Sequence, residues 1–250
     1  MEPSAQHSTP TIAAAPPSAA ELQSVSRLYG TFAALRNVTT SFAAGSCTMI
    51  LGENGAGKST LLRMVAGLIS PSRGSVEVFG GSPQQQRSRI AYMSHAPMLY
   101  DELSAMENLT YFSTLQRGAG CNCVGSPEMA LRAVGLDPHL SRPVGQYSQG
   151  MRQRTSLARV LQTDPELLLL DEPFSNLDVG SARHMVELLA DFRTWPVAPI
   201  PGKDSNGIVG SRTIILTTHQ AHLAEPLADA ILTMQQGQIV SVSPKSGAAE

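Results

Sequence analysis

The stretch GENGAGKST, residues Gly52–Thr60, crowds three glycines ahead of a lysine and two hydroxyl side chains. It directly follows the apolar run Thr48–Leu51, which predicts a short buried strand. It also opens the segment Ser59–Ala66, where leucine and valine recur at helical spacing. A glycine-rich loop between a strand and a helix presents bare backbone N–H groups, so this stretch predicts an α/β fold with an anion site.

The spacing of this stretch, G-x-x-x-x-G-K-[ST], indicates that the anion is the phosphate chain of a nucleoside triphosphate such as ATP. We expect Lys58 to place a cation near the β- and γ-phosphates and Ser59 to ligate Mg²⁺. The alternative is a plain glycine turn before an ordinary helix, which the lysine–hydroxyl pair disfavours. The candidate nucleotide-binding residues of the loop are Gly52, Glu53, Asn54, Gly55, Ala56, Gly57, Lys58, Ser59 and Thr60.

A second apolar run, Leu167–Leu170, ends in two acids, Asp171 and Glu172. Taken alone, this pattern fits a catalytic site and a strand followed by two solvated carboxylates equally well. Because the same chain also has a phosphate-binding loop, we expect Asp171 to hold Mg²⁺ and Glu172 to polarise the attacking water as general base. The two runs together predict a nucleotide-hydrolysing enzyme.

Alternating strand and helix signals extend this prediction to an α/β fold with a mainly parallel central sheet. Thr213–Thr218 predicts a third buried strand, and Asp178–Phe192 predicts a helix. From residue 95 to 163 helical signals dominate, which indicates an inserted helical subdomain. The runs 230–234 and 238–242 flank a glycine turn and predict an antiparallel hairpin.

The chain divides into one domain and three softer segments. Residues 1–20 are rich in Pro, Ala and Ser and predict a disordered tail, because they offer little apolar surface to bury. Residues 21–243 form the predicted domain, with a surface insertion at about 195–211 that is rich in Pro and Gly. Residues 244–250 are expected to be a C-terminal tail.

Composition narrows the possible partners. Eighteen Lys and Arg against 20 Asp and Glu give a net charge of -2, which argues against a nucleic-acid partner. The chain has three cysteines, an odd number that does not suggest a set of disulfides and suits a reducing compartment. Cys121 and Cys123 have no His or second Cys pair nearby in the sequence, so we favour a solvated loop over a metal site there. No apolar run approaches about 18 residues, so a membrane role would need a separate partner.

Five further segments, in the same order, resemble the ATP-binding subunits of ABC transporters over about Leu22–Val242. Tyr29 resembles the aromatic residue that stacks on adenine, the alternative being a half-buried strand tyrosine. Residues 147–154, YSQGMRQR, resemble the family's signature, in which Ser148, Gln149 and Gly150 would bind the γ-phosphate of a nucleotide held by another subunit. Gln149 replaces the more usual Gly and Met151 the more usual Gln, and signatures that end in Gly-Met are typical of exporter-type members.

The same resemblance assigns three more residues. Asp178 lies in a segment similar to the loop that couples two active sites across the dimer. His219 resembles the strand-end histidine that contacts the γ-phosphate. His95 stands where most members have the glutamine that senses Mg²⁺ and reports to the membrane partner, so it is both a nucleotide-site and a metal candidate. A histidine there, together with Ile215–Gln220, resembles the haem exporter subunit of cytochrome c maturation.

The resemblance implies a P-loop NTPase of the ABC ATPase type at the cytoplasmic face of the cell membrane. Two subunits would dimerise head to tail, with each ATP between Lys58 of one chain and Ser148 of the other. The chain would be an ATPase, coupled to transport as a translocase, whose motion passes through residues 95–107 to a separate membrane-spanning partner. The resemblance at His95 and residues 215–220 implies haem export as the transport. The alternatives are a soluble ABC-type ATPase of iron-sulfur cluster assembly and an exporter ATPase for another cargo.

Overall fold

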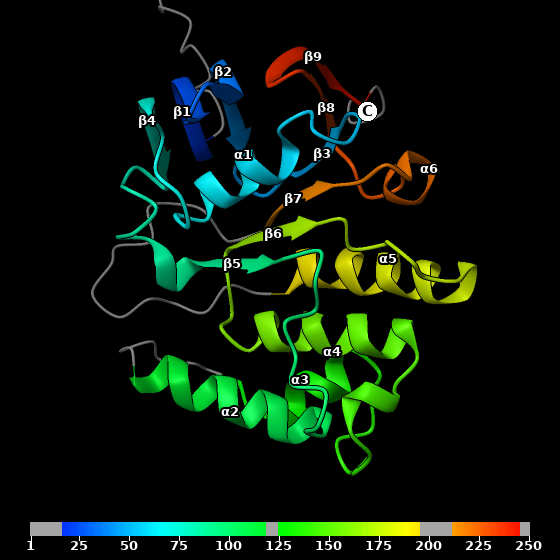
Figure 1. Cartoon of the computed structure of the whole chain (residues 1–250). Coiled ribbons are helices and arrows are strands. Elements are labelled where there is room, and N and C mark those ends of the chain that lie inside the picture. Colours follow the sequence, from blue (N-terminus) through cyan, green and yellow to red (C-terminus); the bar gives the residue numbers. More distant parts are fainter. Residues whose placement is uncertain (1–16, 119–124, 196–211, 246–250) are drawn as a thin grey trace, which may run out of the picture.

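Two β-sheets organise the chain, which the computed structural model describes at residues 17–118, 125–195 and 212–245 (Figure 1). An antiparallel sheet has the strand order β2-β1-β4, from β1 (Ser18–Tyr29), β2 (Phe32–Ala43) and β4 (Arg73–Val78). A six-stranded sheet has the order β5-β6-β7-β3-β8-β9. Its strands are β3 (Cys47–Leu51), β5 (Ile90–Met93), β6 (Leu167–Asp171), β7 (Thr213–Thr217), β8 (Ala230–Gln235) and β9 (Gln238–Pro244).

The centre of the larger sheet is parallel, as the sequence predicts. Strands β5, β6, β7, β3 and β8 pair in parallel, and β9 pairs antiparallel with β8 through a turn that contains Gly237. The predicted strands at 48–51, 167–170 and 213–218 agree with β3, β6 and β7 to within one residue at each end. The predicted α/β class and the terminal hairpin are therefore confirmed.

Helices cover both faces of this sheet. Helix α1 (Lys58–Val65) lies between the two sheets, and α5 (Val179–Thr194) and α6 (Ala221–Ala224) lie on the other side (Figure 1). The described part of residues 95–163 contains helices and turns only: α2 (Ala105–Gly118), α3 (Pro127–Ala133), η2 (Val144–Gln146) and α4 (Gln149–Leu161). The short η1 (Arg87–Arg89) precedes β5.

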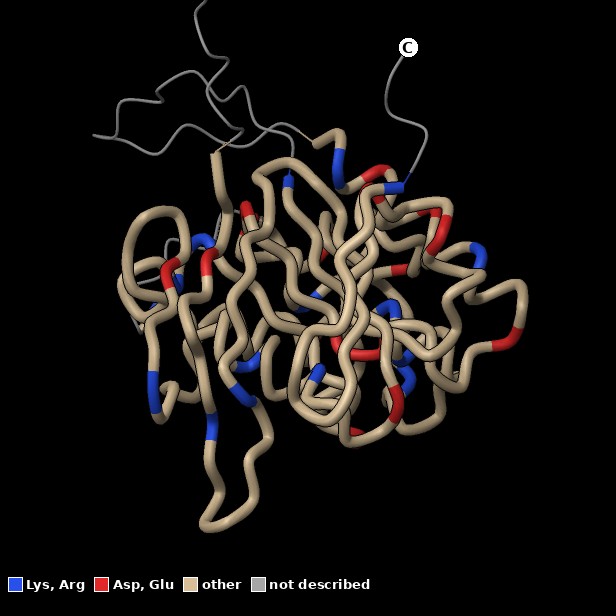
Figure 2. The backbone as a smooth tube through the Cα atoms, turned by 90° about the horizontal axis from the view of Figure 1, so that it is seen from above, with Lys and Arg blue, Asp and Glu red and all other residues tan. Residues whose placement is uncertain are grey.

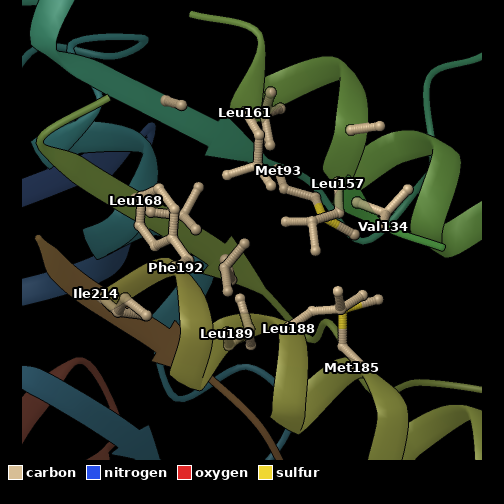
Figure 3. Packing of buried hydrophobic residues seen from close by; sticks show 14 of the residues in the cluster. Met93, Val134, Leu157, Leu161, Leu168, Met185, Leu188, Leu189, Phe192 and Ile214 are labelled. Atoms are coloured by element: carbon tan, nitrogen blue, oxygen red, sulfur yellow. The ribbon is translucent and has the colours of Figure 1, made fainter. Parts of the chain in front are cut away.

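Strand β6 shows why both faces need cover. Leu167 and Leu169 belong to the core beneath α1 and the antiparallel sheet, whereas Leu168 and Leu170 belong to the core beneath the helices. All four are fully buried, and burial of one leucine contributes about 1.5–3 kcal/mol. Figure 3 shows Leu168 packed among Phe192, Leu189 and Ile214.

The ordered domain begins earlier and ends later than the sequence predicts. The predicted tail includes residues 18–20, yet these residues form the start of β1, and Ala20 pairs with both Phe42 and Val78. Ala19 and Ala20 are buried in this sheet, at 0% and 1% exposure. Alanine is only weakly hydrophobic, so the composition of this segment does not indicate a buried strand. Pro244 likewise belongs to β9. Residues 1–16, Cys121 and Cys123, and 196–211 of the predicted insertion lie outside the described residues.

Charged residues of both signs are interspersed along the described chain (Figure 2). This distribution agrees with the near-neutral composition. The absence of a nucleic-acid partner stays a prediction.

Candidate functional site

The carboxyl ends of four parallel strands meet at one edge of the six-stranded sheet. Thr217 at the end of β7 pairs with Ile50 of β3 on one side and with Asp171 of β6 on the other. In parallel sheets this edge is where ligands bind. A cleft of about 980 Å³ opens there.

Most of the predicted nucleotide residues line this cleft. Its walls include Gly52, Glu53, Asn54, Gly55, Ala56, Gly57, Lys58, Ser59, Thr60, His95, Asp171, Glu172 and His219. Residues that are more than 150 positions apart in the sequence are thus brought to one site. Ser148, Gln149, Gly150, Asp178 and Tyr29 are not part of this lining.

The glycine loop has a backbone that only glycine tolerates. Gly52 and Gly57 have φ values of 152° and 102°, in the region that side chains disfavour. A Cβ at Gly52 would lie 2.4 Å from the Met234 carbonyl oxygen, and one at Gly57 would lie 2.7 Å from that of Ala34. Helix α1 then starts at Lys58 without a side-chain cap, so its first N–H groups are free to bind an anion.

Lys58 lies beneath this loop with only 7% of its surface exposed. Its Nζ donates to the carbonyl oxygens of Gly52 and Glu53, at 2.6 and 3.1 Å. The ammonium is therefore held at the floor of the cleft by charge-assisted hydrogen bonds.

Asp171 collects three hydroxyl groups. Its Oδ1 accepts hydrogen bonds from Ser59 Oγ at 2.8 Å and Thr217 Oγ1 at 2.9 Å. Its Oδ2 accepts one from Tyr92 Oη at 3.2 Å. Arg63 Nε in turn donates to Tyr92 Oη at 3.4 Å.

Ser59 and Asp171 suit Mg²⁺ because both offer oxygen, the ligand type this ion prefers. Among the described residues no group of three His, Cys, Asp or Glu could hold a metal ion alone. That fits Mg²⁺, which takes one or two protein ligands and completes its shell with phosphate and water. His95 lies on the wall of the same cleft, and its metal role stays a prediction.

Glu172 and His219 form a pair at the mouth of the cleft. Glu172 Oε2 lies 2.9 Å from His219 Nδ1 and accepts the His219 backbone N–H at 3.2 Å. The Glu172 side chain is 14% exposed, and that of His219 is 57% exposed. Glu172 has a φ of 55° and is held by its N–H, which donates to Thr217. Such strained backbone clusters at active sites, which supports the assignment of Glu172.

The signature residues gather at a second place, where the N-termini of α4 and α5 meet. Ser148 caps α4, and its Oγ accepts the Met151 N–H at 3.3 Å. Asp178 caps α5 and accepts from Ser181 Oγ and N–H at 2.7 and 2.9 Å, which lowers the pKa of Asp178. A Cβ at Gly150 would lie 2.4 Å from Ser181 Oγ, so the two helix ends are in close contact.

Phe32 is an aromatic residue on the cleft wall that the sequence patterns do not indicate. Phe32 is 59% exposed and lines the cleft. Tyr29 pairs with Phe32 across the turn between β1 and β2. The guanidinium carbon of Arg27 lies 4.7 Å from the centre of the Tyr29 ring. The adenine-stacking role of Tyr29 stays a prediction, with Phe32 as a second candidate.

Sequence reasoning missed three contacts around Asp171: the Tyr92 and Thr217 hydroxyls, which donate to its carboxylate, and Arg63, which donates to Tyr92. Tyr92 sits on β5 opposite Leu169, two residues before Asp171. Tyr92 lies between the buried residues Ala91 and Met93 in a short apolar run, which could have indicated a strand. Only the pairing of β5 with β6 shows which group the Tyr92 hydroxyl contacts.

Comparisons with known proteins agree with this geometry. A family model described as "ABC transporter" matches residues 35–175, and one described as "AAA domain, putative AbiEii toxin, Type IV TA system" matches 140–225. The ABC transporter ATP-binding protein NatA of Bacillus subtilis is 31% identical over 83% of this chain and 80% of its own length. A fluoroquinolones export ATP-binding protein of Mycobacterium tuberculosis is 34% identical over 84% of this chain and 64% of its own. The Nod factor export ATP-binding protein I of Rhizobium johnstonii is 33% identical over 90% of this chain and 69% of its own.

A solved structure shares the fold. The ATP-binding cassette MJ0796, a dimer bound to ADP and phosphate, superposes with a TM-score of 0.74 at 22% identity. The match covers 91% of this chain and 99% of the other.

Proposed function

This chain belongs to the ABC transporter family as an ATP-binding subunit whose activity is ATP hydrolysis coupled to transport, and we propose that it drives a separate membrane-spanning partner. The observation that carries the proposal is the meeting of the glycine loop, Asp171 and the Glu172–His219 pair in one cleft. A phosphate cradle, a metal ligand and a general base are the parts that phosphoryl transfer to water requires.

Each residue has a defined part in hydrolysis. The N–H groups of the loop and Lys58 bind the phosphates of ATP. Ser59 and Asp171 would hold Mg²⁺, which offsets negative charge on the β- and γ-phosphates when bound. Glu172 accepts a proton from the attacking water, and His219 orients the Glu172 carboxylate through Nδ1.

We infer that the active unit is a head-to-tail dimer. Ser148, Gly150 and Asp178 lie together but outside the lining of their own chain's cleft. Residues placed in this way can complete the site of a second copy, with the N-terminus of α4 facing the γ-phosphate. The ATP-bound dimer closes, and hydrolysis reopens it.

The partner and the location follow from the transport role. The described part of the chain holds no helix with the length and hydrophobicity needed to span a membrane. We propose that the chain binds peripherally at the cytoplasmic face and passes its motion through the surface of residues 95–107. That surface includes His95, which also lines the cleft.

We propose export as the direction of transport. Relatives named above are export ATP-binding proteins for fluoroquinolones and Nod factors, although another relative is a sulfate/thiosulfate import protein. These names do not support haem or cytochrome c maturation, so that prediction rests on His95 and residues 215–220 alone. A soluble ATPase of iron-sulfur assembly remains the runner-up.

Two measurements test the proposal. The purified chain should hydrolyse ATP only with Mg²⁺, and Lys58→Ala should abolish ATP binding because it removes a charge-assisted phosphate contact. Mild solubilisation of native membranes should then recover the chain with a membrane-spanning protein. Recovery with soluble scaffold proteins and no membrane protein would favour the iron-sulfur alternative.

A further inference from the structure

Gln153 is a buried polar residue of α4 that has no part in the hydrolysis steps assigned to the cleft. Only 1% of its surface is exposed. Its Nε2 atom donates to the carbonyl oxygen of Pro173 at 3.1 Å, and this hydrogen bond is buried. Its Oε1 atom is also buried and accepts no hydrogen bond from the residues that the structure describes. The amide of Gln153 is therefore only half satisfied.

Packing alone does not explain a half-satisfied amide at this position. An unpaired buried acceptor opposes folding, whereas an apolar side chain of the same length would fill the same space without that cost. The orientation of the amide is fixed by chemistry, because a carbonyl oxygen can only accept and must face the amide nitrogen. What Gln153 supplies, and a methionine or leucine would not, is a hydrogen-bond donor for Pro173.

Pro173 directly follows Glu172, the proposed general base. Glu172 has a φ of 55°, and a non-glycine residue keeps such a backbone only where the surrounding contacts hold it. Its N–H donates to the carbonyl oxygen and the hydroxyl of Thr217, both at 3.1 Å. Its carbonyl oxygen accepts the Ser175 N–H at 3.2 Å, which closes a turn over residues 172–175. The Gln153 side chain ties this turn to α4.

The hydrogen bond from Gln153 acts close to the Glu172 carboxylate. The proline ring locks φ of Pro173, and the peptide bond before it is planar, so few rotatable bonds separate the Pro173 carbonyl from Glu172. A displacement of about 1 Å in a catalytic geometry can cost about 100-fold in rate. A contact that fixes the turn at Pro173 therefore also fixes the direction of the Glu172 side chain.

We propose that Gln153 is a positioning residue for hydrolysis, which aims the Glu172 carboxylate at the attacking water by holding the Pro173 carbonyl. Glu172 lines the cleft and Gln153 does not, so Gln153 acts through Glu172 and not on ATP. Loss of the donor lets the turn relax, so proton transfer to Glu172 slows while the phosphate contacts of the glycine loop stay intact. The inference rests on the proposed role of Glu172 as general base.

Gln153→Met is the direct test, because it keeps the length of the side chain and removes the donor. It exchanges one unpaired acceptor, Oε1, for another, the Pro173 carbonyl oxygen, so the urea unfolding midpoint should stay close to that of the wild type. The kcat of ATP hydrolysis should fall about 10- to 100-fold, while KM and the affinity for a fluorescent ATP analogue should change less than about twofold. Gln153→Leu should behave in the same way.

Thr155→Val is the matched control on the same helix. Thr155 is fully buried, and its hydroxyl donates to the Met151 carbonyl oxygen at 2.8 Å, within α4. Loss of this hydrogen bond should lower the urea midpoint and change kcat less than about twofold, because the bond does not reach the turn at Glu172. The two variants should thus show opposite patterns of stability and turnover.

A double-mutant cycle with Glu172→Gln shows whether Gln153 acts through Glu172. A glutamine at position 172 cannot accept the proton, so the residual hydrolysis no longer depends on where that side chain points. Gln153→Met should therefore lower kcat in the wild-type background but not in the Glu172→Gln background. An equal fold loss in both backgrounds would overturn the inference in favour of a general structural role. A normal kcat in Gln153→Met, a loss confined to KM, or failure of both Gln153 variants to fold would overturn it as well.

Glu172→Gln alone separates this inference from the proposed function. Slow hydrolysis by Glu172→Gln together with normal turnover by Gln153→Met rejects the positioning role of Gln153 and leaves the general base in place. Unchanged hydrolysis by Glu172→Gln rejects the proposed role of Glu172 and the inference that rests on it.

Discussion

Gly150→Ala tests the contact that positions the signature residues. The added Cβ would lie 2.4 Å from Ser181 Oγ and 2.8 Å from Ser181 Cβ, both shorter than real contacts allow. The hydroxyl could rotate, but the Cβ of Ser181 is fixed by the backbone of α5. The N-termini of α4 and α5 must therefore move apart, which displaces Ser148 from Asp178.

The cost follows from the overlap. Overpacking of a tight site by one carbon typically destabilises a protein by about 1–3 kcal/mol. Ser181→Ala in the Gly150→Ala background removes the 2.4 Å overlap and leaves the one at 2.8 Å, so it should recover part of the loss. Ser181→Gly removes both overlaps. By itself it should cost about 1 kcal/mol, because α5 loses the hydroxyl hydrogen bond to Asp178 and gains a glycine.

Urea denaturation and ATP turnover of the four variants measure this series. Gly150→Ala should lower both the unfolding midpoint and the turnover, and Ser181→Gly added to it should raise the midpoint relative to Gly150→Ala alone. Equal midpoints for wild type and Gly150→Ala would refute the close contact. A Gly150→Ala/Ser181→Gly variant that is less stable than Gly150→Ala would refute the assignment of the clash to Ser181.

Three further predictions concern other parts of the chain. Tyr92→Phe removes one hydrogen bond to Asp171 worth about 1 kcal/mol, so Mg-ATP should bind about fivefold more weakly in a titration, while binding of ATP without Mg²⁺ is unchanged. A chain that starts at residue 17 should melt like the full chain, whereas one that starts at residue 21 loses the start of β1 and should melt several degrees lower in calorimetry. Burial raises the pKa of the Cys47 thiol to about 12 from 9.0 in the unfolded chain, so iodoacetamide at pH 8 should label Cys47 only after unfolding. The unfolded thiol ionises first as pH rises from about 9 towards 12, so stability should fall over that range, less steeply in Cys47→Ala.

The sequence predicts best what local chemistry determines. The strand before Gly52, the acids after Leu170 and the helix after Asp178 all carry local signals, and each lies where those signals place it. The antiparallel sheet of β1, β2 and β4 was not assigned to particular residues. Its strands mix polar and small side chains, and four register shifts between β1 and β2 interrupt the two-residue alternation of buried and exposed side chains.

Contacts between distant segments could not be predicted. The Tyr92 hydroxyl reaches Asp171 only because β5 and β6 are neighbours, although 79 residues separate them. Phe32 lines the cleft because a two-residue turn folds β2 back along β1. Arg159 likewise contacts the Phe112 ring only because α2 packs on α4.

The shared site is the central claim, and Glu172→Gln tests it most directly. Glutamine keeps the shape of the side chain but cannot accept the proton, so ATP should bind and remain unhydrolysed. With ATP and Mg²⁺, size-exclusion chromatography with light scattering should show a dimer that retains ATP, and adding Ser148→Arg should return it to a monomer. A Glu172→Gln chain that stays monomeric with ATP bound would contradict the account.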